Sequence, residues 1–264
     1  MDVHTPRTLE EALRLKAERP EARFVQGGTD LMVELNFGRS RPDAIVNLAE
    51  LSELRGWSRE NDDLRLGAAL TYTEAMQGEP ARLVPSLAEA SRTVGSPQIR
   101  NRGTIGGNLG TASPAGDALP PLLAEHARVE IASIRGGRAL PLDEFLLGVK
   151  RSALAPDELI TAVRLTPSGA PQTFMKVGPR NAMVIAICSL AVVVDPEAGE
   201  VRAAFGSAAE TAKRVIVPLA DAAELPARVA DAASPIDDVR ATGAYRRHAL
   251  RVLAGRALER CLRS

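Results

Sequence analysis

Glycines are concentrated between positions 103 and 117 of this 264-residue sequence. Five of these fifteen residues are glycine, more than the interior of a helix or strand tolerates, so the segment is predicted to be a loop. Successive N–H groups of such a loop can converge on an anion, phosphate above all. Thr104, Asn108, Thr111 and Ser113 add short polar side chains that can donate to phosphate oxygens. The residue types leave a ligand loop and a structural turn equally open.

Asp117 closes this glycine-rich segment, directly before an apolar run at 118–123 that is typical of a helix start. A carboxylate at that position can serve as the N-cap of the helix. It can equally accept a hydrogen bond from a sugar or ribityl hydroxyl, as acidic residues of nucleotide sites do.

A second glycine pair stands near the N-terminus, in Gly27-Gly28-Thr29-Asp30. A short strand is predicted at 23–26 and a helical pattern at 31–35, so the pair joins a strand to a helix. This arrangement aims backbone donors at a phosphate. Because two such loops occur in one small protein, a ligand with a diphosphate group becomes the more plausible interpretation.

The composition excludes several classes of protein. Lys+Arg and Asp+Glu are both 33, and this zero net charge lacks the basic excess that nucleic-acid binding requires. The longest apolar run, 183–194, is too short to span a bilayer, and the N-terminus carries no apolar signal, so we expect no membrane association and a cytoplasmic location. Two cysteines, Cys188 and Cys261, cannot bind an iron–sulfur cluster, and Cys188 is expected to be a buried small hydrophobe.

Known nucleotide and metal motifs are missing from the sequence. It contains neither the G-x-G-x-x-G pattern of a βαβ unit nor a Walker lysine motif. His4, His126 and His248 are not spaced as metal ligands, so no metal site is expected. No serine or cysteine nucleophile set stands out either.

The pattern of elements predicts an α+β fold, because strands come as neighbouring hairpins more than in strict βαβ alternation. The clearest hairpin joins 128–134 to 138–142, and Thr71 and Glu74 form a predicted capping box. Polar composition around 57–63 and a proline-rich linker at 167–171 divide the chain into three parts. We expect them at 1–60, 61–169 and 170–264.

Several motifs, in this order and spacing, resemble the FAD-binding (medium) subunit of the molybdenum hydroxylases, the family of xanthine dehydrogenase and carbon monoxide dehydrogenase. They are Gly27-Gly28-Thr29-Asp30, Gly95-Ser96-Pro97-Gln98-Ile99-Arg100-Asn101, Thr104-Ile105-Gly106-Gly107-Asn108, Ser113-Pro114-Ala115-Gly116-Asp117, Lys176-Val177-Gly178-Pro179-Arg180, Ala204-Phe205-Gly206 and Arg246-Arg247-His248-Ala249-Leu250. The resemblance implies a two-part FAD-binding module of the PCMH/vanillyl-alcohol-oxidase type, followed by a small α+β C-terminal domain of the CO dehydrogenase flavoprotein type.

The resemblance also implies roles for individual residues. Backbone N–H groups of Gly27, Gly28, Thr29, Gly106, Gly107 and Asn108 would hold the FAD diphosphate, Thr104 and Ser113 would add hydroxyl donors, and Asp117 would accept from a ribose or ribityl hydroxyl. Val94, Ile105 and Ile160 match positions that pack on the cofactor rings, although ordinary core positions explain Val94 and Ile160 equally well. The remaining expected cofactor contacts are Val25, Gln26, Asp30, Leu31 and Lys176.

Lys176 matches a family lysine near the flavin pyrimidine edge, where a cation stabilises the negative charge of reduced flavin. Residue type alone favours a solvated surface lysine instead. The family commonly shows Arg-x-x-x-Asp-Ile-Ala after this lysine, whereas this chain has Val184 in the acidic place. That departure puts standard handling of the flavin edge, or of NAD+, in doubt.

The resemblance implies an electron-transfer subunit that takes electrons from a [2Fe-2S] subunit and passes them to NAD+ or oxygen. A separate molybdopterin-containing large subunit would oxidise the substrate, and the expected assembly is a dimer of heterotrimers. The motifs at 96–101 and 180–183 look closest to xanthine dehydrogenase-like members. Two alternatives stay open: a stand-alone flavin oxidoreductase and a non-catalytic assembly subunit.

Overall fold

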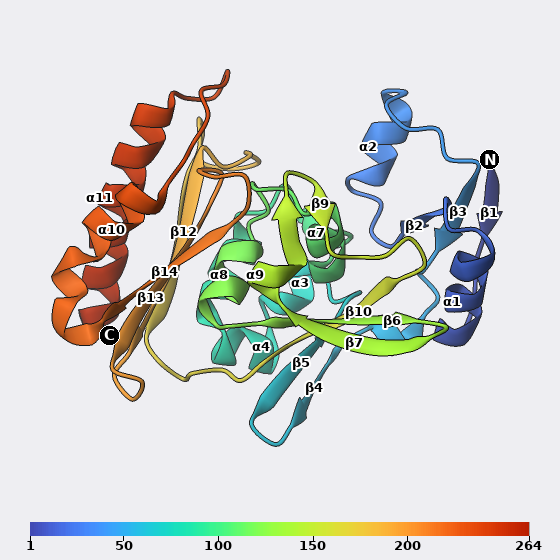
Figure 1. The fold of residues 1–264 in the computed structure, drawn as a ribbon, viewed down its shortest axis with the longest axis horizontal. Coiled ribbons are helices and arrows are strands. Elements are labelled where there is room, and N and C mark those ends of the chain that lie inside the picture. The colour runs from blue at the N-terminus through green and yellow to red at the C-terminus, as the bar shows by residue number, and fades with distance from the viewer. Residues whose placement is uncertain (264) are drawn as a thin grey trace.

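The computed structural model describes residues 1–263, which form three main sheets arranged in chain order along the longest axis of the molecule (Figure 1). The N-terminal sheet lies at one end, the C-terminal sheet at the other, and a five-stranded sheet with most of the short helices lies between them. Two of the three sheets are antiparallel and most helices stand outside βαβ units, so the predicted α+β class is confirmed.

The first sheet is parallel, with strand order β1-β3-β2. Its strands are β1 (Asp2–His4), β2 (Arg23–Val25) and β3 (Ala44–Asn47), and the crossover helices are α1 (Leu9–Glu18) and α2 (Leu31–Asn36). Parallel strands need such crossovers, so this part departs from the hairpin pattern expected for the chain.

The second sheet is antiparallel, with strand order β4-β5-β10-β6-β7. Its strands are β4 (Trp57–Glu60), β5 (Asp63–Gly67), β6 (Arg128–Ser133), β7 (Gly136–Pro141) and β10 (Leu159–Leu165). The predicted hairpin is therefore confirmed, with Ile134 and Arg135 at its turn.

Short helices fill the stretch between β5 and β6. They are α3 (Tyr72–Ala75), α4 (Gly78–Leu83), α5 (Pro85–Arg92), α6 (Pro97–Arg100), α7 (Ile105–Thr111) and α8 (Leu119–Ala124). The capping box predicted at the start of α3 is confirmed, because the Thr71 side chain accepts from the Glu74 N–H while the Glu74 carboxylate accepts from the Thr71 N–H. After β7 follow α9 (Leu142–Phe145), β8 (Leu146–Gly148) and β9 (Arg151–Ser152).

The third sheet is an antiparallel meander of β11 (Gln172–Val177), β12 (Cys188–Asp195), β13 (Glu200–Gly206) and β14 (Lys213–Pro218). Every residue of β12 is buried, since α11 (Gly243–Arg263) packs on one face of the strand and α8 on the other. Helix α10 (Leu225–Ala232) extends the first layer over β13 and β14, and α5 extends the second over β11. Alternate residues of β12 therefore belong to two different cores (Figure 1). Cys188 is fully buried, as predicted.

The prediction that 103–117 is entirely loop was wrong, because Ile105–Thr111 forms helix α7 despite its three glycines. Close contact explains the exception: a Cβ on Gly106 would lie 2.6 Å from both the Cβ and the carbonyl oxygen of Ala68. The side chain of Thr104 caps the helix by accepting from the Gly107 N–H at 3.0 Å. Tertiary contact at Ala68 thus overrides the low helix propensity of glycine.

Candidate functional site

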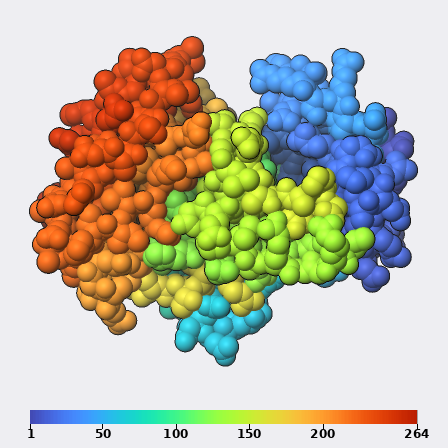
Figure 2. Space-filling model, viewed as in Figure 1, coloured from blue at the N-terminus to red at the C-terminus, as the bar shows by residue number. Residues whose placement is uncertain are grey.

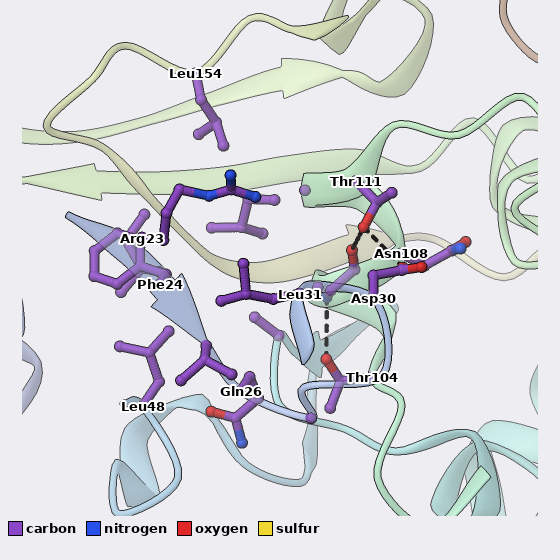
Figure 3. Close-up of a pocket in the computed structure, with 18 of the residues that line it drawn as sticks. Arg23, Phe24, Gln26, Asp30, Leu31, Leu48, Thr104, Asn108, Thr111 and Leu154 are labelled. Atoms are coloured by element: carbon purple, nitrogen blue, oxygen red, sulfur yellow. Dashed lines mark hydrogen bonds between the residues drawn. The ribbon is translucent and has the colours of Figure 1, made fainter. Parts of the chain in front are cut away.

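A cavity of about 610 Å³ lies between the first sheet and α7, a volume within the range of small-molecule sites (Figure 3). Its walls come from the segment that follows β2, from α7 and from the segment that leads into β10. Figure 2 shows the surface hollowed between α2 and the central part of the molecule. Most of the predicted cofactor residues line this cavity, namely Val25, Gln26, Gly27, Gly28, Thr29, Asp30, Leu31, Thr104, Gly106, Gly107, Asn108 and Ile160.

The first glycine loop presents free backbone donors to this cavity. The N–H groups of Gly27, Gly28, Thr29 and Asp30 have no hydrogen-bond acceptor within residues 1–263. Gly28 has a φ of +74°, a conformation that side chains disfavour and that lets neighbouring N–H groups point the same way. Free N–H groups beside a cavity are potential donors to an anion.

The second glycine segment contributes differently from the expectation. The N–H groups of Gly106, Gly107 and Asn108 are engaged, with the Ala68 carbonyl, the Thr104 hydroxyl and the Thr104 carbonyl as their acceptors. The glycines of α7 therefore offer a wall without side chains, along which a ligand can approach the backbone closely. The free donors come from the first loop.

The two glycine segments are locked together. A Cβ on Gly27 would lie 2.0 Å from the carbonyl oxygen of Arg102, so only glycine allows this approach. On the cavity side, the Thr111 hydroxyl lies 3.0 Å from Asp30 Oδ2 and 2.9 Å from the Gly107 carbonyl oxygen (Figure 3). The spacing between the loops is thus fixed by the protein itself.

Two buried acceptors in the cavity wall lack hydrogen-bond donors. Gln26 Oε1 and Asn108 Oδ1 are both inaccessible to solvent and unpartnered within residues 1–263. Leaving such groups unsatisfied costs roughly 1–3 kcal/mol each.

The mouth of the cavity is lined by charges that the sequence did not single out. Glu34, on α2, lies 3.4 Å from Arg23 Nη2 and 3.2 Å from Lys150 Nζ. The Lys150 hydrogen bond, with Arg23 beside it, lowers the pKa of Glu34. Arg23, Lys150 and Leu154 line the cavity without any motif, so only their placement in the fold reveals them.

Five of the predicted cofactor residues do not line this cavity, namely Val94, Ile105, Ser113, Asp117 and Lys176. Ile105 is fully buried in the core, and Val94 packs against the same core. The Ser113 hydroxyl accepts from the Ala115 N–H at 3.3 Å. These five residues therefore lie outside the cavity between the first sheet and α7, which we call the glycine-loop cavity.

Asp117 and Lys176 form a buried ion pair. Lys176 Nζ lies 2.5 Å from Asp117 Oδ2 and 3.3 Å from the Thr93 carbonyl oxygen. The side chains are 7% and 6% exposed, so a surface location for Lys176, which residue type alone favoured, is wrong. Burial raises the pKa of Asp117, and Lys176 opposes that rise. Asp117 does not cap α8, whose N-cap is Ala118.

Asp117 keeps one oxygen, Oδ1, buried and without a partner in the described chain. Burial raises the pKa of Tyr72, and the negative charges of Asp117 and Asp30 add to that rise. Because Tyr72 lines the glycine-loop cavity, Asp117 stands close behind its wall.

Val184 lies in the loop between β11 and β12, which leads away from Lys176. A Cβ on Gly178 would lie 2.7 Å from Val184 Cγ2, so the valine folds back over this glycine. Arg240 Nη1 donates to the Ala186 carbonyl at 3.2 Å and holds the loop to the C-terminal part. Hydrogen bonds from Arg240 to Asp238 in turn lower the pKa of Asp238.

None of the helices within residues 1–263 combines the length and the apolar character needed to cross a membrane. No group of three or more His, Cys, Asp or Glu side chains within residues 1–263 could hold a metal ion.

Known proteins similar to this chain agree with the geometry. The family model for the FAD binding domain in molybdopterin dehydrogenase matches residues 1–167. The chain is 34% identical over 216 residues to the xanthine dehydrogenase FAD-binding subunit of Escherichia coli O157:H7, covering 79% of this chain and 74% of that one. It is 37% identical over 205 residues to the nicotinate dehydrogenase FAD-subunit of Eubacterium barkeri, covering 74% and 69%.

The fold is also that of a solved structure. Carbon monoxide dehydrogenase from Hydrogenophaga pseudoflava aligns over 99% of this chain and 97% of its own, with a TM-score of 0.91 and 24% identity. Since the family model covers more than half of the sequence, the chain belongs to the FAD-binding domain family of molybdopterin dehydrogenases, as the flavoprotein component of a molybdenum hydroxylase-type oxidoreductase.

Proposed function

We propose that this chain carries electrons from a [2Fe-2S] subunit to NAD+ or oxygen within a three-subunit molybdenum hydroxylase. The observation that carries the proposal is the set of free N–H groups at 27–30, in a loop that lines a cavity of about 610 Å³ together with α7. Those donors match the charge of a diphosphate. Bound FAD would supply a carrier that accepts and releases electrons.

Each wall of the cavity would contact a different part of FAD. Gly27, Gly28 and Thr29 would donate their N–H groups to the diphosphate oxygens, while Gly106 and Gly107 leave room for its approach. Thr29 and Thr104 line the same cavity, and their hydroxyl groups would pair with phosphate oxygens or sugar hydroxyls. The residues present therefore fit the cofactor in charge and in hydrogen-bonding capacity.

For Lys176 and Asp117 we propose an electrostatic role at the flavin edge. The ammonium group of Lys176 would stabilise negative charge that grows on the flavin ring when electrons arrive, and so raise its reduction potential. Asp117 partly cancels that field, because it lies 2.5 Å from the ammonium group. The reduction potential of the flavin would thus depend on the balance between the positive field of Lys176 and the negative field of Asp117.

The assembly that we propose follows from what the chain lacks. Residues 1–263 hold no metal-binding group, so clusters and molybdenum would belong to partner subunits, in a dimer of heterotrimers in the cytoplasm.

A purine such as xanthine is the proposed substrate class, supported by the similarity to a xanthine dehydrogenase subunit. We keep the division at 1–60, 61–169 and 170–264 as the proposed domain limits.

Reconstitution tests this function. The chain would be co-expressed with its iron–sulfur and molybdenum partner subunits, reduced anaerobically with xanthine, and followed by its flavin absorbance. Flavin reduction only in the assembled complex, with reoxidation by NAD+ or oxygen, would support the proposal. Turnover of a small substrate by the isolated chain would contradict it in favour of a stand-alone oxidoreductase.

A further inference from the structure

Tyr72 is a buried side chain that lines the glycine-loop cavity, although it was not among the predicted cofactor residues. It is 5% exposed, and its hydroxyl group has no hydrogen-bond partner within residues 1–263. Unlike Gln26 Oε1 and Asn108 Oδ1, this unpartnered oxygen is not shut off from solvent, so it opens onto the cavity. Because a buried phenol normally finds a hydrogen-bond partner, the Tyr72 hydroxyl is a donor that awaits a ligand.

Backbone contacts fix the position of the Tyr72 side chain. Tyr72 is the first residue of α3, directly after the Thr71 cap, and its N–H group donates to the Gly103 carbonyl at 3.1 Å. The ring lies against Gly103, where an added Cβ would stand 3.1 Å from the ring atom Cε2. A donor that is already held in place loses little conformational freedom when a ligand binds.

The phenol of Tyr72 lies in the negative field of two carboxylates. Burial raises its pKa and the charges of Asp117 and Asp30 raise it further, so the phenol stays protonated at neutral pH. Asp30 belongs to the loop with the free N–H groups, whereas Asp117 is paired with Lys176 behind the cavity wall. Tyr72 therefore stands between the proposed diphosphate site and the proposed position of the flavin edge.

We propose that Tyr72 binds the ribityl chain of FAD by donating its phenol hydrogen to a ribityl hydroxyl oxygen. This inference rests on the proposed function, since the ribityl chain is the part of FAD that joins the diphosphate to the flavin ring. The carboxylates of Asp30 and Asp117 repel a phosphate group at this point, whereas a hydroxyl group carries no charge. The neutral segment of the cofactor is thus the one that fits beside the Tyr72 hydroxyl.

Tyr72→Phe tests this contact, because it removes the hydroxyl and keeps the ring that packs on Gly103. Affinities of the flavin-free chain for FAD and for ADP would be measured by isothermal titration calorimetry, since ADP carries a diphosphate but no ribityl chain. We expect the variant to bind FAD about two- to tenfold more weakly than the wild type. Its ADP affinity and melting temperature should be unchanged, because the lost hydroxyl has no partner within residues 1–263.

The second tyrosine of the chain provides the matched control. Tyr245→Phe removes a hydroxyl from a ring that is 48% exposed on α11, and it should change neither affinity. This variant also leaves Tyr72 as the only tyrosine of the sequence. With tyrosine labelled with ¹³C at Cζ, the single NMR signal then reports hydrogen bonding at the Tyr72 oxygen. We expect the signal to shift when FAD is added and to stay in place with ADP.

The outcomes separate this contact from its alternatives. Equal weakening of FAD and ADP binding in Tyr72→Phe would overturn the ribityl contact, because the hydroxyl would then serve the diphosphate or the fold. Unchanged FAD affinity, or a Tyr72 signal that FAD does not move, would overturn it as well. The NMR signal decides the question if ADP binds too weakly to be measured. A wild-type chain that binds no FAD would count against the proposed function instead.

Discussion

Replacing Gly27 by alanine should damage both the fold and the cofactor site. Gly27 lies so close to the second glycine segment that an added Cβ would stand 2.0 Å from the Arg102 carbonyl oxygen and 2.7 Å from its carbonyl carbon. Both of these atoms belong to the backbone, so no side-chain rotation relieves the clash.

The size of the effect follows from this distance. Ordinary contact begins at 3.4 Å, so the two segments must separate by 1.4 Å, the difference between 3.4 and 2.0 Å. Overpacking of this kind costs about 1–3 kcal/mol. For a chain of this size, that cost lowers the melting temperature by about 2–12 °C.

Affinity for FAD should fall in parallel. The displacement moves the free N–H groups at 27–30, and one hydrogen bond to a charged group contributes about 1.5–3 kcal/mol. Loss of one such bond weakens binding by about 10- to 100-fold.

Thermal unfolding and titration with FAD, followed by flavin fluorescence, measure the two effects. Gly137→Ala is the matched control, because its nearest neighbour would be an ordinary 3.5 Å from the new Cβ and the position is exposed on β7. If Gly27→Ala kept the melting temperature and the FAD affinity of the control, the close contact between the loops would be refuted.

Four further variants test the geometry. Thr111→Val removes the hydroxyl beside Asp30 and should weaken FAD binding by a few-fold in the same titration, since a hydrogen bond contributes about 0.5–1.5 kcal/mol. Lys176→Met should lower the flavin reduction potential and Asp117→Asn should raise it; shifts of the same sign in spectroelectrochemical titration would contradict the proposed electrostatic role. The pKa of Asp238 is lowered in the folded chain, so its ion pairs stabilise the fold at pH values above the unfolded pKa. This stabilisation is lost as the pH falls toward the pKa of the folded chain. Asp238→Asn should therefore lose less stability on acidification than the wild type, as measured by circular dichroism.

Local patterns predicted what depends on local chemistry. The hairpin of β6 and β7 and the capping box at Thr71 follow from residue types within a few positions of each other. The glycine pair at Gly27-Gly28 indicated an anion site because free N–H groups need little beyond a strand, a turn and a helix.

Contacts between segments that are far apart in the chain could not be predicted from the sequence. Helix α7 forms because Gly106 packs against Ala68, and the same contact engages the N–H group that was expected to face the ligand. Lys176 is buried because its partner stands 59 positions away, at Asp117. Neither the Gly106–Ala68 contact nor the Lys176–Asp117 ion pair can be inferred from residue spacing, since both depend on how the sheets are placed.

The visible spectrum of the purified chain tests the central claim most directly, with the released chromophore identified by chromatography and mass. We predict one non-covalent FAD per chain in the wild type and in Gly137→Ala, and a clear deficit in Gly27→Ala. A colourless wild-type chain that takes up no added FAD would contradict the cofactor site between the two glycine segments.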